Sequence, residues 1–413
     1  MNPRRARRSE WFDHGNPGVA HDLGTLGVCA RVPALAGLLP VCVRLPRRPD
    51  PEEFDLTGFE AATLISAFLL TYGVMQVPAG VLLDRVGVRR VLPLAGVGAG
   101  LSVGAFGLAS DFGELLGARI AAGAFMAFAF PAMGQIARRQ LPPGRFVLAM
   151  ALADMSFGGG AVLVAGVTEF VDGSAWRELV QVQAVLGLVL AATLWLALRP
   201  MSGGRAKGLE TDAIGSSLRR ALRRRSTLQG ALLYAWGAGL TFGFGGYWNL
   251  KLEKACGCSA PQVSEHSTAL FGGLALGMLI AGLLGDRSSR WRPALLGASI
   301  SSVALVVALL LGSGPLPFLA VGILNFALGM TLGTCALAFA VAARDISTKE
   351  AATVVAIVNA AGCISGAFFG ELPIWMGDGQ ASVFTVGVVY VGVALLGVGA
   401  SWSLPPRRPA TPG

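Results

Sequence analysis

Long apolar runs alternate with short polar segments along most of the 413-residue chain. Eleven of these runs approach or exceed the length of about 20 residues that a helix needs to cross a bilayer. A weaker run at 24–43 contains Arg31 and two prolines. The pattern predicts an all-α integral membrane protein with a less well-defined first span at 24–43. The clear runs cover 58–82, 91–109, 113–137, 146–168, 176–198, 228–250, 267–285, 293–311, 316–341, 351–375 and 382–404.

A charged motif occurs twice, at half the chain length. Its residues Gly80, Asp84, Arg85 and Arg90 recur as Gly282, Asp286, Arg287 and Arg292, each 202 positions later. Such a repeat is typical of membrane proteins that are built from two similar halves. The chain is therefore expected to consist of a tail at 1–23, a six-helix bundle at 24–198, a linker at 199–227, a second six-helix bundle at 228–404 and a tail at 405–413.

Composition agrees with a membrane protein, and charge predicts its orientation. Charged residues make up 14% and apolar residues 54% of the chain, whereas soluble domains have about 25% charged residues. The termini and the loops on their side hold 25 of the 33 Lys and Arg residues, and the opposite loops hold six. Since basic loops stay inside, both termini are expected in the cytoplasm and the protein in the cell membrane. The net charge of +9 then reflects topology rather than nucleic-acid binding.

The linker has a pattern of its own. Ile214, Leu218 and Leu222 recur every four residues among five arginines. This spacing predicts a basic amphipathic helix on the anionic inner leaflet, with a disordered basic linker as the alternative.

Enzyme chemistry finds no support in the sequence. The only histidines are His14, His21 and His266, and none lies in the middle of a clear span. No His and Cys residues have the spacing of a metal site, so neither a metal nor a cofactor is expected. Most tryptophans, Trp248 among them, fall near the ends of spans and are expected to form an interfacial belt.

The motif at 80–90, its second copy at 282–292 and the six-plus-six plan resemble the major facilitator superfamily. So do Arg119 and Gly123 in the fourth span, Trp176-Arg177 at the start of the sixth, and the run from Phe54 through Tyr72, Gln76 and Pro78. The resemblance covers residues 51–404 and is nearest to bacterial permeases. It implies two pseudo-symmetric six-helix bundles around a central cavity that opens alternately to each side.

The function implied by this resemblance is secondary active transport. The resemblance does not identify the substrate. We expect a small organic solute, with proton coupling as an option, and a monomer in contact with membrane lipid. A sensor or receptor that has the same fold but no transport activity is the alternative.

The repeated motif predicts a gate. Asp84 lies at a helix end, where an acid can contact the positive N-terminus of the span at 351–375. That span is preceded by Ser347 and Glu350, which have the spacing of a capping box with Ser347 as N-cap and Glu350 at the third position. Asp286 is expected to contact the start of the span at 146–168 in the same way. The predicted gate comprises Gly80, Asp84, Arg85, Arg89, Arg90, Asp286, Arg287, Ser347 and Glu350. The alternative is that these charges only set the topology.

Polar residues inside spans are further candidates, because ionisable groups in lipid cost free energy. By the repeat, Asp154 aligns with Asn359 and Arg119 with Asn325. Asp154, Asn325 and Asn359 lie about 13–14 Å from a span end, near the middle of the bilayer. At that depth Arg31, rather than Arg119, would match Asp154. These five residues are the candidates for the cavity and for coupling, with packing or interfacial roles as the alternatives. Aromatic residues in the seventh span, such as Tyr234, could stack on a solute or pack in the core.

Overall fold

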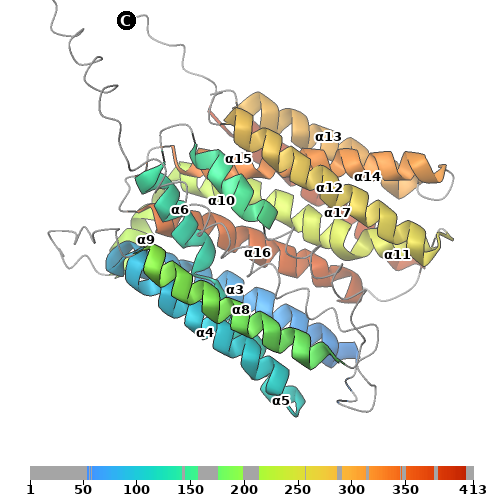
Figure 1. The fold of residues 1–413 in the computed structure, drawn as a ribbon. Helices are drawn as coiled ribbons and strands as arrows, with labels where there is room; N and C mark the ends of the chain where they lie inside the picture. The colour runs from blue at the N-terminus through green and yellow to red at the C-terminus, as the bar shows by residue number, and fades with distance from the viewer. Residues whose placement is uncertain are drawn as a thin grey trace, which may run out of the picture.

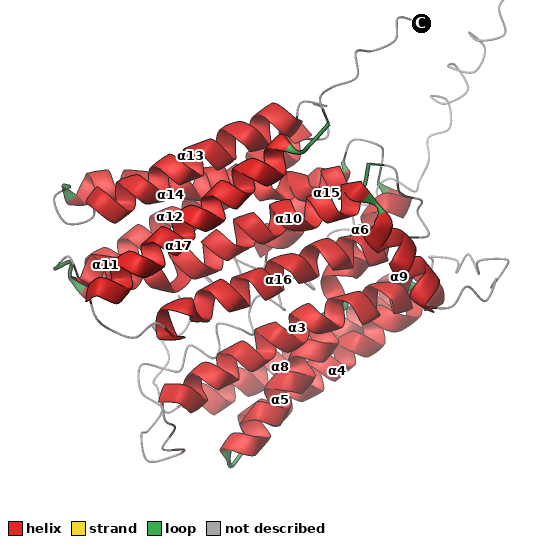
Figure 2. Cartoon of the chain, turned by 180° about the vertical axis from the view of Figure 1, so that it is seen from behind, coloured by secondary structure: helices red, strands yellow, loops and turns green. Residues whose placement is uncertain are grey.

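The computed structural model describes residues 54, 56, 58–141, 145–156, 175–198, 214–255, 257–285, 291–312, 316–344, 346, 350–375 and 380–405. Within these ranges the chain is helical apart from short turns, and no strand occurs there (Figure 2). The predicted first span with Arg31 lies outside the described residues. So do Ser347, Asp286 and Arg287.

The first half of the chain contributes six described helices. They are α3 (Gly58–Val86), α4 (Val88–Leu108), α5 (Phe112–Met126), α6 (Ala129–Gln140), a helix at Phe146–Ser156 and α8 (Trp176–Ala197). α5 and α6 together make one span, Phe112–Gln140. Arg177 donates hydrogen bonds of 2.8 Å to the carbonyl oxygens of Gly107 and Ala109, at the end of α4. A cation at a helix C-terminus is stabilising, which gives the Trp176-Arg177 pair a structural role.

The second half follows a short linker helix, α9 (Ile214–Arg223). The amphipathic helix expected in the linker is thus present. The seventh span consists of α10 (Arg225–Gly239), a π-helical segment η2 (Leu240–Trp248) and α11 (Asn249–Ala255). The remaining elements are α12 (Ala260–Gly285), α13 (Trp291–Gly312), α14 (Phe318–Gly333), η3 (Thr334–Ala336), α15 (Leu337–Ala342), α16 (Ala351–Trp375) and α17 (Gln380–Trp402).

The predicted spans correspond well to these helices. Among the described residues, nine helices are long and apolar enough to cross a membrane. The helix Phe146–Ser156 is the described part of the fifth predicted span. The seventh is divided among α10, η2 and α11.

The helices form two groups, and α16 lies where the groups meet (Figures 1 and 2). α3, α4, α5 and α8 make one group, and α10 and α12–α17 make the other. α9 and α6 lie near one end of the molecule, and α11 lies at the opposite end (Figure 1). We call these the linker end and the far end.

Gly80 allows α3 and α16 to pack closely across the two groups. A Cβ at this position would lie 2.6 Å from the Cβ of Ala356 and 2.7 Å from the carbonyl oxygen of Ala352. Gly282, its counterpart in the repeat, faces the helix Phe146–Ser156 in the same way, with Ala151 3.0 Å from such a Cβ. The two glycines therefore permit matching contacts between the halves.

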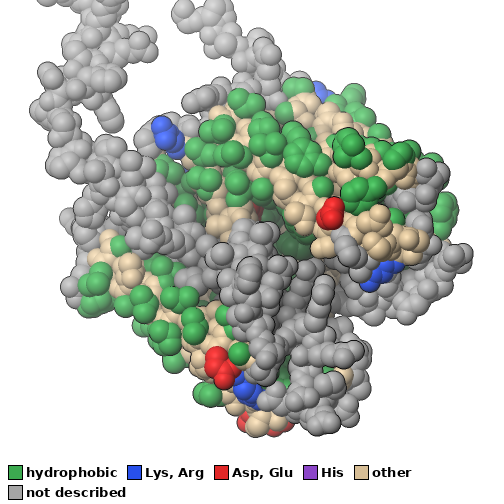
Figure 3. All heavy atoms as spheres, turned by 45° about the vertical axis from the view of Figure 1, so that its right-hand side comes forward, with side chains coloured by type: hydrophobic (Ala, Val, Ile, Leu, Met, Phe, Trp, Pro, Cys, Tyr) green, Lys and Arg blue, Asp and Glu red, His purple; other side chains and the backbone are tan. Residues whose placement is uncertain are grey.

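Many apolar side chains point outward, as expected for helices surrounded by lipid. They are spread over the described part of the face that Figure 3 shows, and Leu94, Leu396 and Trp402 are each at least 66% exposed. The interfacial interpretation is wrong for Trp248, which is fully buried. Its ring packs against Phe244 and Tyr390, with centroids 5.1 and 5.6 Å away. Position near a span end does not reveal that the side chain faces the core.

Candidate functional site

A carboxylate from one group of helices caps a helix of the other. Asp84, near the end of α3, accepts a 2.8 Å hydrogen bond from the backbone N–H of Thr353 and one of 3.2 Å from that of Ala352. It also accepts bonds from the Thr353 hydroxyl at 2.7 Å and from the Gln135 amide at 2.8 Å. The first N–H groups of a helix have no partner within the helix, so Asp84 satisfies two of those of α16.

Glu350 plays a different part from the one its spacing predicts. α16 begins at Ala351, and the Glu350 carbonyl accepts the first helical hydrogen bond, from Val354 at 3.0 Å. Glu350 is therefore the N-cap residue and not the third residue of the helix, so the capping-box prediction is wrong in register. Its carboxylate instead pairs with two linker arginines, Arg224 at 2.7 Å and Arg220 at 3.3 Å. These pairs attach α9 and the start of α10 to the start of α16.

A third contact at the linker end involves a cation and the C-terminus of a helix, instead of an anion and an N-terminus. The Arg138 guanidinium of α6 donates hydrogen bonds of 3.0 Å to the carbonyl oxygen of Ala343 and 3.1 Å to that of Ile346. These carbonyls follow the C-terminus of α15, where the helix dipole favours a cation. The sequence reasoning did not single out Arg138. Its only signal was a basic residue at the end of a span, which topology alone explains.

Together these contacts join helices of the two halves at the linker end. We call Asp84, Gln135, Arg138, Glu350 and their partners on α9, α10, α15 and α16 the linker-end gate. The motif residues Arg85, Arg89 and Arg90 lie beside it with exposed side chains. Gly87 has a φ of 92°, which explains why the turn between α3 and α4 carries glycine.

The second feature is a hydrogen bond between the two halves of the chain at mid-depth. The Tyr234 hydroxyl of α10 donates to the Asp154 carboxylate at 2.8 Å. The other carboxylate oxygen, Oδ2, is buried and has no hydrogen-bond partner among the described residues. Tyr234 is about 13 Å along α10 from its start, which places the pair near the middle of the membrane. The sequence indicated Asp154 as a candidate, but it indicated Tyr234 only as an aromatic residue for stacking or packing and not as the partner of Asp154 from the other half of the chain.

Other polar side chains gather around this pair. Tyr72 of α3 lies beside Gln76 and beside Asn359 of α16. Gln76 is fully buried, and neither polar atom of its amide has a partner within the described part of the chain. Buried polar groups are normally hydrogen-bonded, so unpaired ones mark a place where a ligand or water can bind. We call Tyr72, Gln76, Asp154, Tyr234 and Asn359 the central polar cluster.

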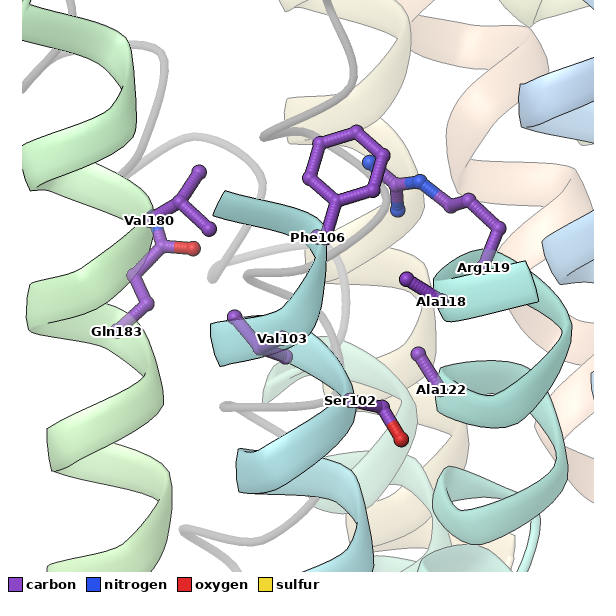
Figure 4. A pocket seen from close by; sticks show the side chains of 8 residues that line it. All are labelled: Ser102, Val103, Phe106, Ala118, Arg119, Ala122, Val180 and Gln183. Carbon is purple, nitrogen blue, oxygen red and sulfur yellow. The ribbon is translucent and has the colours of Figure 1, made fainter. Parts of the chain in front are cut away.

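Arg119 and Asn325 lie elsewhere. The Arg119 guanidinium sits over the Phe106 ring, 4.2 Å from its centroid, beside a small pocket between α4, α5 and α8 (Figure 4). Asn325 is buried within the second group and bonds to Asn249 and Glu253. No group of metal-binding side chains occurs among the described residues.

Comparison with known proteins identifies the family. A family model described as Major Facilitator Superfamily matches residues 34–370. The chain belongs to this superfamily. Two strains of Mycobacterium tuberculosis, CDC 1551 / Oshkosh and ATCC 25618 / H37Rv, have a probable nitrate/nitrite transporter, NarK2, that is 24% identical over 371 residues. The match covers 87% of this chain and 90% of the relative.

Solved structures of the superfamily share the fold. FucP, in E. coli a fucose:proton symporter, matches in its outward conformation with a TM-score of 0.68 and 15% identity, over 92% of this chain and 99% of its own. The human organic anion transporter MFSD10 matches with a TM-score of 0.62 and 18% identity, over 91% and 97%. This major facilitator protein is thus a multi-pass secondary transporter with the twelve-helix fold.

The linker-end gate leads to a first prediction. In a cysteine-free background with the reporter Val355→Cys, which is buried where α16 meets Gly134, Asp84→Asn should speed alkylation roughly 2- to 30-fold. That range corresponds to the loss of one contact with a helix terminus. N-ethylmaleimide labelling of the protein in membranes measures the rate.

Arg89→Gln is the control, because this motif arginine is exposed. It should leave the labelling rate unchanged. If Asp84→Asn folds normally and labels at the rate of the parent, the contact does not hold the gate.

Proposed function

We propose that this transporter carries a small organic solute that is neutral or cationic, and that Asp154 couples its movement to protons. The observation that carries the proposal is the Asp154–Tyr234 hydrogen bond, which joins the two halves of the chain at mid-depth. In an alternating-access transporter the solute and coupling-ion sites lie between the two halves at this depth.

Coupling follows from what the bond requires. One oxygen of Asp154 lacks a partner among the described residues, and an unpaired charge in a buried place is costly. A proton on the carboxyl group removes that cost. When the two groups separate, Asp154 loses Tyr234 and faces a wet cavity, where the proton can leave. The two arrangements therefore favour different protonation states, which is the physical requirement for coupling.

The nature of the solute follows from the central polar cluster. Its members are a carboxyl group, two amides and two phenol groups. Among the described residues, no Lys or Arg interacts electrostatically with Asp154. The relatives' names indicate nitrate and nitrite, but among the described residues an anion would find no Lys or Arg beside Asp154. A solute with hydroxyl or amino groups could instead donate a hydrogen bond to Asp154 and bond to both polar atoms of the Gln76 amide.

The coupling is testable in proteoliposomes that contain a pH-sensitive dye. Sugars and amines that the wild type carries should acidify the lumen as they enter, and nitrate should not. Asp154→Asn should abolish this acidification and pH-driven accumulation, because an amide cannot titrate, but should preserve solute counterflow. Glu178→Gln, at an exposed acid of α8, is the matched control and should behave as the wild type does.

If the Asp154→Asn variant still accumulates solute under an imposed pH gradient, Asp154 serves only in packing. Nitrate transport by the wild type would overturn the proposed solute class but leave the coupling proposal to its own test.

Orientation is a further part of the proposal. The basic bias of the linker side supports a cytoplasmic linker end with both termini inside. The protein is further proposed to act as a monomer. A reporter fused after Thr211 should therefore read as cytoplasmic, and one fused after Ser259 as external. The opposite pair of readings would invert the topology.

A further inference from the structure

A second buried polar cluster lies at the far end, away from the gate and the central cluster. It consists of Asn249 and Glu253 of α11, His266 of α12 and Asn325 of α14, each at most 2% exposed. His266 Nδ1 is 2.7 Å from Glu253 Oε2, and Nε2 is 2.9 Å from the carbonyl oxygen of Phe318. The other Glu253 oxygen accepts from Asn249 at 2.9 Å and from Asn325 at 3.3 Å.

The geometry fixes the number of protons in the His266–Glu253 pair. A carbonyl oxygen can only accept, so Nε2 must carry a proton to bond to Phe318. The short contact between Nδ1 and Oε2 needs a second proton, whether it resides on the imidazole or on the carboxyl group. The pair therefore holds two protons in this arrangement. Loss of the shared proton would leave a nitrogen lone pair facing a carboxylate oxygen, with no donor between them.

The partners of this pair differ in how firmly they are held. α12 and α14 pack through small residues, with Gly273 and Gly277 on one helix and Gly329 and Gly333 on the other facing the partner's backbone. A Cβ on Gly333, for example, would lie 2.5 Å from the backbone nitrogen of Met278. Such close faces make α12 and α14 one rigid unit.

α11, in contrast, continues from η2, a π-helical stretch of nine residues. π-helical segments are rare and often occur at functional sites. The hydrogen bonds of Glu253 and Asn249 join α11 to the rigid unit of α12 and α14. They are therefore placed to hold the outer part of the seventh span.

We propose that His266 and Glu253 form a proton-binding lock that holds η2 and α11 against α12 and α14 while the shared proton is present. At a pH high enough to remove this proton, α11 separates from α12 and the far end loosens. The lock is independent of Asp154, which lies on a different helix at mid-depth. It adds a proton-dependent conformational step on the side of the membrane opposite the gate.

Among the side chains that the structure describes, no other titratable group is placed to do the same. Among the described side chains, the remaining titratable groups on the elements packed around the pair are Lys254, Cys258, Glu265 and Tyr390. Lys254 and Glu265 are exposed, and Cys258 is partly exposed. The Tyr390 hydroxyl donates to the carbonyl oxygen of Phe369, at 2.7 Å.

Hydrogen–deuterium exchange of the full-length protein in detergent tests the lock. Exchange is compared at about pH 6 and about pH 9, because histidine is the side chain whose charge ordinarily changes near neutral pH. After correction for the intrinsic effect of pH, amides 249–255 of the wild type should exchange roughly tenfold or more faster at the higher pH, as expected when a hydrogen bond to a charged group is lost. Amides of α14 at 324–333 should not change.

Two variants test whether His266 and Glu253 cause the pH dependence of exchange, and a third variant serves as the control. His266→Gln and Glu253→Gln should each remove the pH dependence at 249–255, because neither leaves a pair that shares a proton. Glu265→Gln, one residue from His266 but exposed, should keep it. A wild type without pH-dependent exchange in α11, or a folded His266→Gln that keeps the wild-type dependence, would overturn the proposal. If His266→Gln fails to fold, Glu253→Gln and the pH dependence of exchange in the wild type still test the proposal.

Discussion

The start of α16 depends on a carboxylate that belongs to the opposite group of helices. A helix that begins inside a membrane protein needs partners for its first N–H groups, because lipid offers none. Asp84 provides them from α3, and Gly80, one turn earlier, brings the two backbones close enough for the contact. The interaction is local in geometry but joins segments 268 and 269 residues apart in sequence. Separation of the two groups at this end must therefore leave a helix terminus and a carboxylate without partners.

The strength of these contacts suits a conformational equilibrium. A charge at a helix terminus contributes about 0.3–2 kcal/mol and a hydrogen bond to a charged group about 1.5–3 kcal/mol. A two-state equilibrium shifts from 1:99 to 99:1 with about 5.5 kcal/mol. A few contacts such as those of Asp84, Arg138 and Glu350 are thus enough to favour a closed linker end, and few enough to be broken in each cycle. The central cluster and the His266–Glu253 pair place proton-dependent contacts at two further depths.

The fold and part of the site could be predicted from the sequence, because each rests on a periodic or repeated signal. Apolar runs gave the spans, and the duplicated motif identified Gly80, Asp84 and the helix that Asp84 caps. The predicted first residue of α16 was wrong, because Ser and Glu three residues apart match a capping box whether or not a helix begins there. Arg138 and the bond between Tyr234 and Asp154 were missed because the contacting residues are distant in sequence. The far-end cluster was missed because Glu253 and His266 lie in or beside a predicted loop.

The central claim is that charges at helix termini hold the two groups together at the linker end. Double electron–electron resonance between spin labels at Leu94→Cys on α4 and Leu284→Cys on α12, both exposed to lipid, measures the separation of the groups there. The parent protein should give mainly the shorter distance. Combining Asp84→Asn with Arg138→Gln should make a longer distance the major population, as expected when both contacts with helix termini are lost. An unchanged distance distribution in the folded double variant would contradict the account.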